Sequence, residues 1–191
     1  MKALDAFIVE LKNNVNDTIT TDSGLELYVD TRFNEFDHRV NEGPIHNPPA
    51  RYETGAKPGD TLYFHHHVVL DKGQIMPGED DKYLVFYNEQ QAATNQAIAY
   101  KDQETGEIHQ LFGWALLEPY DEDEEKESEI IEVVKLKQSP VTKGKVAFGV
   151  KEMGLEKGDV VGFKKNRDYR IKIDGKEYYR VAATELLYKQ L

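Results

Sequence analysis

Three consecutive histidines, His65-His66-His67, are the residues whose type and spacing point most directly to chemistry. Side chains alternate between the two faces of a β-strand, so on a strand His65 and His67 would point the same way. Paired imidazoles bind first-row transition metals. The tract predicts either a metal site that uses His65 and His67 or a surface or interface patch of histidines without a metal.

Other catalytic chemistry has little support in the sequence. The chain has no cysteine, which excludes disulfides, thiolate metal sites and a cysteine nucleophile. Carboxylates are dense in residues 121–129, but an exposed acidic run lacks the apolar surroundings that raise a carboxyl pKa for general-acid work. We therefore expect a protein that is not an enzyme and that uses no cofactor.

The charge of the chain limits its partners. The formal net charge of the 191 residues is -11, and such a surface repels phosphate backbones. The first residues are interrupted by Asp5 and Glu10 and do not resemble a secretory signal, and no apolar run approaches the length that spans a bilayer. We expect a cytoplasmic protein whose partners include neither nucleic acid nor membrane.

The elements that must position these residues are mostly strands. Short apolar runs rich in Val, Ile, Tyr and Phe alternate with Gly, Pro, Asn or Asp, which is typical of an all-β fold. The candidate strands are residues 7–11, 25–29, 61–64, 83–87, 114–117, 130–134, 145–150, 160–163, 169–173 and 177–181. Residues 89–99 and 184–189 favour a turn or two of helix by composition.

An internal repeat organises the chain into two halves. Gly59-Asp60-Thr61-Leu62-Tyr63-Phe64 returns as Gly158-Asp159-Val160-Val161-Gly162-Phe163. Three further pairs keep the same order: residues 41–45 with 142–146, 82–85 with 177–181, and 97–100 with 185–188. The polar residues 101–107 separate the halves, so we expect one domain in residues 1–107 and a second in residues 108–191.

The second half resembles the GroES co-chaperonin family over nearly all of its length. That family has a first strand, a long polar loop with a hydrophobic tripeptide, a Lys/Arg-Gly-x-Val strand start, a Gly-Asp-x-Val-x-Phe strand and a closing Ser/Thr-Glu segment. The matching residues are 114–119, 120–142, Lys143-Gly144-Lys145-Val146, 158–163 and 183–187. The first half resembles the family more weakly, through residues 7–10, 12–24, 23–27, 42–45 and 59–64. The resemblance implies two GroES-like β-barrels in tandem, each with a long mobile loop.

The function that this resemblance implies is that of a co-chaperonin. Such a protein forms a homo-oligomeric ring, here expected to be seven-fold, and caps a GroEL-like chaperonin ring. Unfolded client protein is enclosed, and the chaperonin supplies the ATP-dependent step of folding. A tandem chain of this kind suits a cellular or a viral source, and for a viral protein the compartment is the host cytoplasm.

Each loop would bind the chaperonin through a short apolar anchor. Leu25, Glu26 and Leu27 follow a polar run in the first half, and Ile130, Ile131 and Val133 follow the acidic run in the second. Polar segments with little to bury stay unfolded until an apolar anchor meets a groove. The alternative is that residues 25–29 form an ordinary strand with one buried face and that the acidic run is a solvated loop.

A second family offers an enzyme hypothesis. The spacing of Gly59, His65, His67 and Asp71 resembles the first metal motif of the cupins, which implies a metal-dependent enzyme with these three side chains as ligands. The acidic residue is Asp where cupins have Glu, no second motif follows, and the repeat has Lys164-Lys165-Asn166 at the equivalent positions. The histidine tract therefore also fits a surface without a metal.

Overall fold

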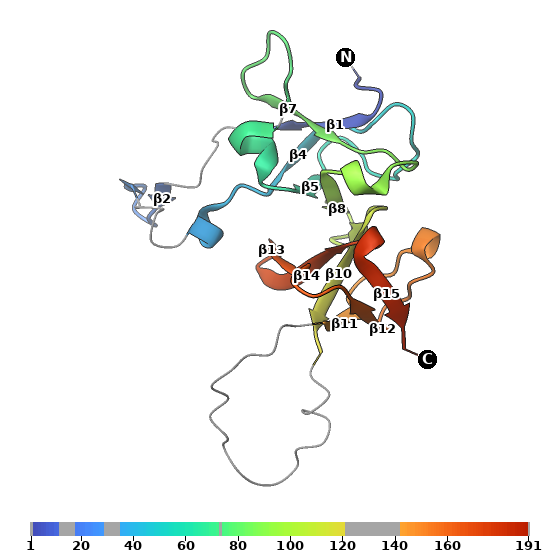
Figure 1. Cartoon of the computed structure of the whole chain (residues 1–191). Helices are drawn as coiled ribbons and strands as arrows, with labels where there is room; N and C mark the ends of the chain where they lie inside the picture. Colours follow the sequence, from blue (N-terminus) through green and yellow to red (C-terminus); the bar gives the residue numbers. More distant parts are fainter. Residues whose placement is uncertain (1, 12–17, 29–34, 73, 121–141, 191) are drawn as a thin grey trace, which may run out of the picture. The chain divides into compact units, whose positions relative to one another are not determined.

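The structure, a computed structural model, describes residues 2–11, 18–28, 35–72, 74–120 and 142–190. Two antiparallel sheets make up most of this part, and its helical elements are single turns (Figure 1). The all-β prediction is confirmed. No helix in the described ranges is long and apolar enough to cross a membrane. The chain forms two compact units, Met1–Asn88 with Thr94–His109, and Glu89–Ala93 with Gln110–Leu191.

The first sheet has seven strands. Their order is β6 (Gln74–Ile75), β7 (Lys82–Phe86), β1 (Ala6–Glu10), β4 (Glu42–Asn47), β5 (Thr61–Phe64), β8 (Ala97–Lys101) and β9 (Ile108–Gln110). A separate two-stranded hairpin consists of β2 (Thr18–Thr20) and β3 (Glu26–Tyr28). The helical turns are η2 (Glu35–His38), the π-helical η3 (Val68–Lys72) and η4 (Ala92–Thr94).

The second sheet has six strands. Their order is β13 (Tyr169–Ile173), β14 (Lys176–Ala182), β10 (Trp114–Pro119), β11 (Lys143–Val146), β12 (Val160–Phe163) and β15 (Leu186–Lys189). Two 3-10 turns accompany it, η5 (Lys151–Met153) and η6 (Ala183–Glu185). The order β6-β7-β1-β4-β5-β8 is therefore repeated as β13-β14-β10-β11-β12-β15.

The register of the strands confirms the internal repeat in its central part. Gly43 lies opposite Leu62 across β4 and β5, and Gly144 lies opposite Val161 across β11 and β12. The last repeated segment is one residue out of register with the prediction. Ala97 pairs with Phe64, and the residue that pairs with Phe163 is Leu186 and not Glu185. The hydrogen bonds between paired strands determine which positions of the two copies are equivalent, and similarity of residue types does not.

A tight turn begins β5, an inner strand of the first sheet. Gly59 has a φ of 96°, and the Asp60 N–H donates to the Lys57 carbonyl at 3.2 Å, as in a type II turn with Pro58 at its second position. The Asp60 carboxylate closes the turn by accepting the Lys57 N–H at 2.8 Å. The Gly59 N–H donates to the Ile45 carbonyl at 2.8 Å, which ties the turn to β4.

The second sheet repeats this turn bond for bond. Gly158 has a φ of 95°, and the Asp159 carboxylate accepts the Glu156 N–H at 2.7 Å. The Gly158 N–H donates to the Val146 carbonyl at 2.8 Å. The two copies differ in the further partner of the carboxylate, which is the Gln103 N–H at 3.1 Å for Asp60 and the Lys189 ammonium at 2.7 Å for Asp159.

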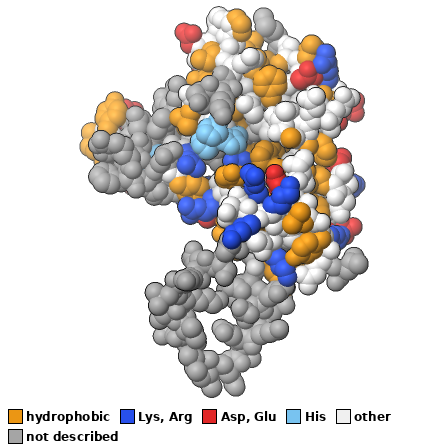
Figure 2. Space-filling model, viewed as in Figure 1, with side chains coloured by type: hydrophobic (Ala, Val, Ile, Leu, Met, Phe, Trp, Pro, Cys, Tyr) orange, Lys and Arg blue, Asp and Glu red, His pale blue; other side chains and the backbone are white. Residues whose placement is uncertain are grey.

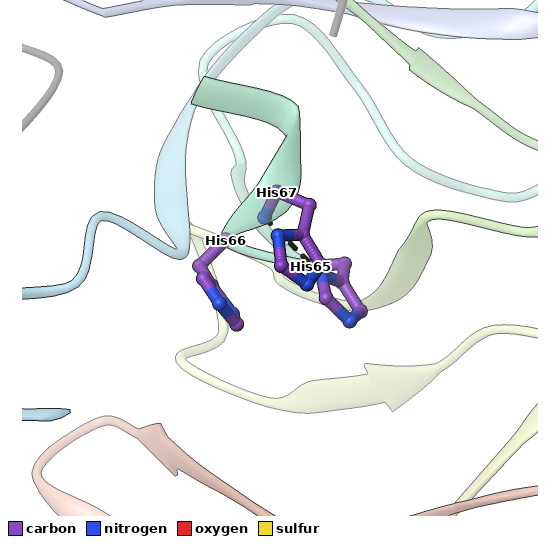
Figure 3. Close-up of side chains that lie close together, drawn as sticks. All are labelled: His65, His66 and His67. Carbon is purple, nitrogen blue, oxygen red and sulfur yellow. Dashed lines mark hydrogen bonds between the residues drawn. The ribbon is translucent and has the colours of Figure 1, made fainter. Parts of the chain in front are cut away.

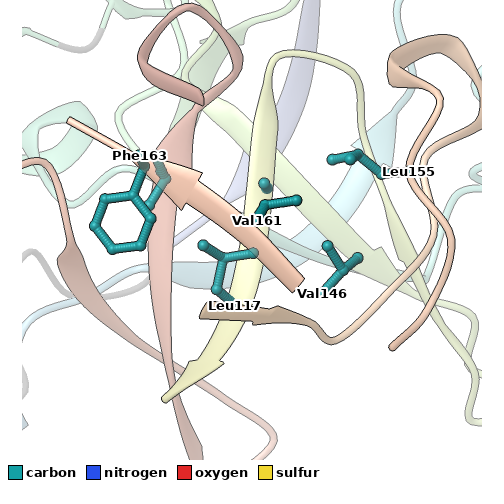
Figure 4. Packing of buried hydrophobic residues seen from close by; sticks show 7 residues of the cluster. Leu117, Val146, Leu155, Val161 and Phe163 are labelled. Atoms are coloured by element: carbon teal, nitrogen blue, oxygen red, sulfur yellow. The ribbon is translucent and has the colours of Figure 1, made fainter. Parts of the chain in front are cut away.

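The core of the second unit is enclosed by one face of its own sheet (Figure 4). Apolar side chains from four strands meet there: Ala115 and Leu117, Val146, Val161 and Phe163, and Val181, with Leu155 from the loop before β12. Neither sheet closes on itself, since no pairing within the described residues joins the first strand of either order to the last. The sheets are present, and the closed barrels expected from the sequence are not confirmed.

Each of the two stretches that favoured helix holds one 3-10 turn followed by strand residues. Only Ala92–Thr94 and Ala183–Glu185 form a 3-10 turn, and β8 and β15 follow them. Their helix propensity is overridden because β8 and β15 supply the outer hydrogen-bonding partners of β5 and β12, and unpaired backbone groups on these central strands would cost more than the propensity contributes.

We expect Gly144→Ala to lower the free energy of unfolding by about 1–3 kcal/mol, the usual cost of overpacking a core. A Cβ at Gly144 would lie 2.8 Å from the Cβ of Leu117, a fully buried residue whose Cβ moves only with β10. Gly43→Ala is the matched control, because its near contact is the terminal Leu11 Cδ2, which can rotate away. Urea unfolding followed by circular dichroism measures both, and equal losses would contradict this account.

The ion pair at the second turn predicts a pH dependence of stability. The hydrogen bond from Lys189, followed by that from the Glu156 N–H, lowers the pKa of Asp159 below its ordinary value of 3.8. The carboxylate therefore stabilises the fold above this ordinary value, and the contribution is lost as the pH falls through the lowered, folded-state pKa. We expect Asp159→Asn to be less stable than wild type at neutral pH and the difference to shrink in acid. Lys189→Met should reduce the same pH dependence, and a difference that stays constant in acid argues against the pair.

Candidate functional site

The hairpin of β2 and β3 is built by a polar turn. The Thr21 N–H donates to the Leu25 carbonyl at 2.9 Å, and the Gly24 N–H donates to the Thr21 carbonyl at 2.8 Å. Gly24 has a φ of 81°, so the loop is a three-residue hairpin connection that ends in a left-handed glycine. The Thr21 hydroxyl accepts the Leu25 N–H at 3.1 Å. The run Thr-Asp-Ser-Gly thus determines where β3 starts.

The apolar side chains of β3 and the residue before it face solvent. Leu25 is 59% exposed, Leu27 47% and Tyr28 83%, and Glu26 is exposed as well. Neither strand pairs with a strand of the larger sheets. The alternative prediction of an ordinary strand with one buried face is wrong, because both faces of β3 are open. Tyr28, the most exposed of these residues, was not among the predicted anchor residues.

The hairpin lies in the connection between β1 and β4, and the equivalent connection between β10 and β11 holds the second predicted anchor. Ile130, Ile131 and Val133 lie outside the described residues, as does the acidic run before them. The two predicted anchors therefore occupy matching places in the order of strands, one in each copy of the repeat.

The three histidines form the other chemical feature of the chain (Figure 3). The ring of His65 stacks on those of His66 and His67, whose own pair is tilted, and the centroids lie 4.3–4.8 Å apart. One candidate ligand atom from each residue lies within 4.8 Å of the others. All three are half-buried. Figure 2 shows histidine side chains gathered in one patch of the surface.

The geometry that the sequence predicted for these histidines is wrong in one respect. β5 ends at Phe64, so the chain turns at His65, and His66 joins the other two rings where strand alternation would have placed it on the opposite face. His65 and His67 do come together, with ring centroids 4.4 Å apart. The side chain of Asp71, the third ligand of the cupin-like arrangement, lies outside the described part of the chain.

The second copy of the repeat has a lysine, Lys164, at the position equivalent to His65. The His65 N–H donates to the Gln96 carbonyl at 2.9 Å, and the Lys164 N–H donates to the Glu185 carbonyl at 3.0 Å. The Lys164 ammonium also pairs with the Glu185 carboxylate at 2.8 Å, and this hydrogen bond lowers the pKa of Glu185. An ion pair therefore stands where the first copy has an imidazole, so the histidine cluster is a feature of the first copy.

Comparison of the chain with models of protein families gave no match, and neither did comparison with curated proteins.

Because the hairpin leucines contact solvent, we expect Leu25→Ala combined with Leu27→Ala to change the free energy of unfolding by no more than about 0.5 kcal/mol, as is usual for surface substitutions. Leu62→Ala is the comparison, because Leu62 is fully buried in β5 and its truncation should cost about 2–5 kcal/mol. Urea unfolding measures both variants. A loss of several kcal/mol in the double variant would mean that the hairpin packs on the core.

Proposed function

We propose that this protein is a co-chaperonin built from two GroES-like barrels in tandem, and that it caps a chaperonin ring through apolar anchors on its inter-strand connections. In this proposal Leu25, Glu26 and Leu27 form one anchor, and Ile130, Ile131 and Val133 form the other. The protein acts by binding and catalyses no reaction, while the chaperonin provides ATP hydrolysis and the chamber for the client protein.

The observation that carries this proposal is the exposed apolar hairpin. Leu27 lies on, and Leu25 directly before, a strand of a two-stranded sheet that is separate from the larger one, and both are about half exposed or more. A two-stranded hairpin is only marginally stable by itself, so exposed leucines on it bring no stability to the fold. Apolar side chains held in this way are suited to burial in the groove of a partner.

The strength of one such anchor explains why a ring is part of the proposal. Burial of one leucine contributes roughly 1.5–3 kcal/mol, and about 4 kcal/mol corresponds to a millimolar dissociation constant. Two leucines on one hairpin therefore bind weakly. Several anchors on a homo-oligomeric ring bind together, because each event after the first is intramolecular and proceeds at a high effective concentration.

The repeated strand order supports the tandem arrangement within this proposal. Six strands recur in the same order, and the same Gly-Asp turn begins β5 and β12. The two anchors follow equivalent strands, β1 and β10. A duplicated scaffold with one apolar anchor per copy is the arrangement expected if both halves descend from a single anchor-bearing barrel.

The test is co-elution with a purified chaperonin of the source cell on size-exclusion chromatography, with and without adenine nucleotide. We expect a complex that depends on nucleotide and that the Leu25→Ala, Leu27→Ala variant abolishes, since the anchor supplies the buried apolar surface. The matched control is Leu70→Ala with Ile75→Ala, two leucine-sized exposed residues outside the hairpin, which should co-elute like wild type.

A variant of the second connection completes this experiment. Replacement of Ile130, Ile131 and Val133 by Ala separates the contributions of the two anchors. Loss of the complex in either anchor variant supports the proposal for that anchor, and unchanged co-elution of the variant that lacks both anchors contradicts it. Absence of any complex with the wild-type protein would remove the co-chaperonin function while the fold stands.

A further inference from the structure

We propose that His65, His66 and His67 form a binding site for a late first-row divalent metal ion, with Zn²⁺ as the probe ion. This site is independent of the co-chaperonin function proposed above, because it uses none of the anchor residues. It also differs from the cupin-like arrangement, because all three ligands are consecutive imidazoles and His66 is one of them.

The backbone gathers the three imidazoles on one turn of chain. β5 ends at Phe64, and the next residues form a turn in which the Val68 N–H donates to the His65 carbonyl at 3.0 Å and the Val69 N–H donates to the His66 carbonyl at 3.2 Å. Val68 and Val69 are buried, which anchors the end of the turn in the core. The three side chains therefore start from fixed, neighbouring positions.

A backbone hydrogen bond orients the first imidazole. The His67 N–H donates to Nδ1 of His65 at 3.1 Å (Figure 3). The ring is thereby held with Nδ1 toward the turn, and a metal ion would bind the imidazole through one of its ring nitrogens. A metal at Nδ1 of His65 would replace the His67 N–H as the partner of that lone pair.

The spacing of the ligand atoms is close to what a metal needs. With Zn–N bonds of about 2.0–2.1 Å, two ligands of a tetrahedral ion lie roughly 3.4 Å apart, and the three nitrogens here lie within 4.8 Å of one another. The stacked rings do not yet aim their lone pairs at one point, because a lone pair lies in the plane of its ring. Rotation of the side chains about χ1 and χ2, without movement of the turn, would bring the nitrogens together.

The donor set selects the class of ion. Three imidazole nitrogens suit Zn²⁺, Ni²⁺ and Cu²⁺, whereas Mg²⁺ and Ca²⁺ prefer oxygen ligands. The net charge of -11 attracts cations to the surface in general, so a specific site must be separated from this diffuse attraction by its dependence on the three histidines and on the fold.

The experiment is a calorimetric titration of tag-free protein with Zn²⁺, together with thermal unfolding followed by circular dichroism. We expect one ion to bind per chain and to raise the melting temperature, because an ion that binds the folded chain more tightly than the unfolded one stabilises it. The variant His65→Gln, His66→Gln, His67→Gln should bind about tenfold or more weakly and lose this rise, since even loss of a group that only orients a ligand costs at least that much.

The matched control replaces the other three histidines of the chain, in His38→Gln, His46→Gln, His109→Gln. It removes the same number of imidazoles and should keep both the stoichiometry and the rise in melting temperature. Equal Zn²⁺ affinity of the two triple variants would overturn the proposal. So would equal affinity of the wild-type chain in concentrated urea, because the tract would then bind without the fold. Circular dichroism of each variant without metal verifies that it is folded.

Discussion

The structure depends on one turn that occurs twice. At the start of β5 and of β12, a glycine with positive φ lets the chain reverse, and the next aspartate closes the turn by accepting a backbone N–H. The glycine N–H then bonds to the preceding strand. Because a shift of one residue would exchange the buried and exposed faces of a strand, this turn determines which side chains of the central strands enter the core.

The two copies share this turn, but they place a large and a small side chain on opposite members of the same strand pair. Tyr63 lies opposite Ala99 in the first sheet, and the equivalent pair in the second sheet is Gly162 opposite Tyr188. The Tyr188 ring lies directly over Gly162. A large and a small residue have thus changed places between neighbouring strands. The register is preserved, whereas the sequence identity is not, and this explains why the repeat is divergent in sequence and regular in strand order.

The residues suited to binding a partner or a metal ion lie where the two copies differ or where the chain leaves the sheets. The hairpin with Leu25 and Leu27 occupies the connection between β1 and β4 and contributes no strand to the larger sheet. The histidines lie just beyond β5, at a place where the second copy has the ion pair of Lys164 with Glu185. The duplicated sheets form the scaffold, and the connections and strand ends carry residues that the scaffold does not need for its stability.

The sequence by itself determined the all-β class, most strands and the two Gly-Asp turns, because apolar runs, turn residues and the repeat are local signals. It also located the exposed leucines and the histidine tract. Only the tertiary structure decided that residues 97–101 and 186–189 are strands, that both faces of β3 are open, and that His66 joins His65 and His67. The physical reason is that these outcomes depend on which backbone groups find a ladder partner and on where a strand ends, and both are set by residues distant in the chain.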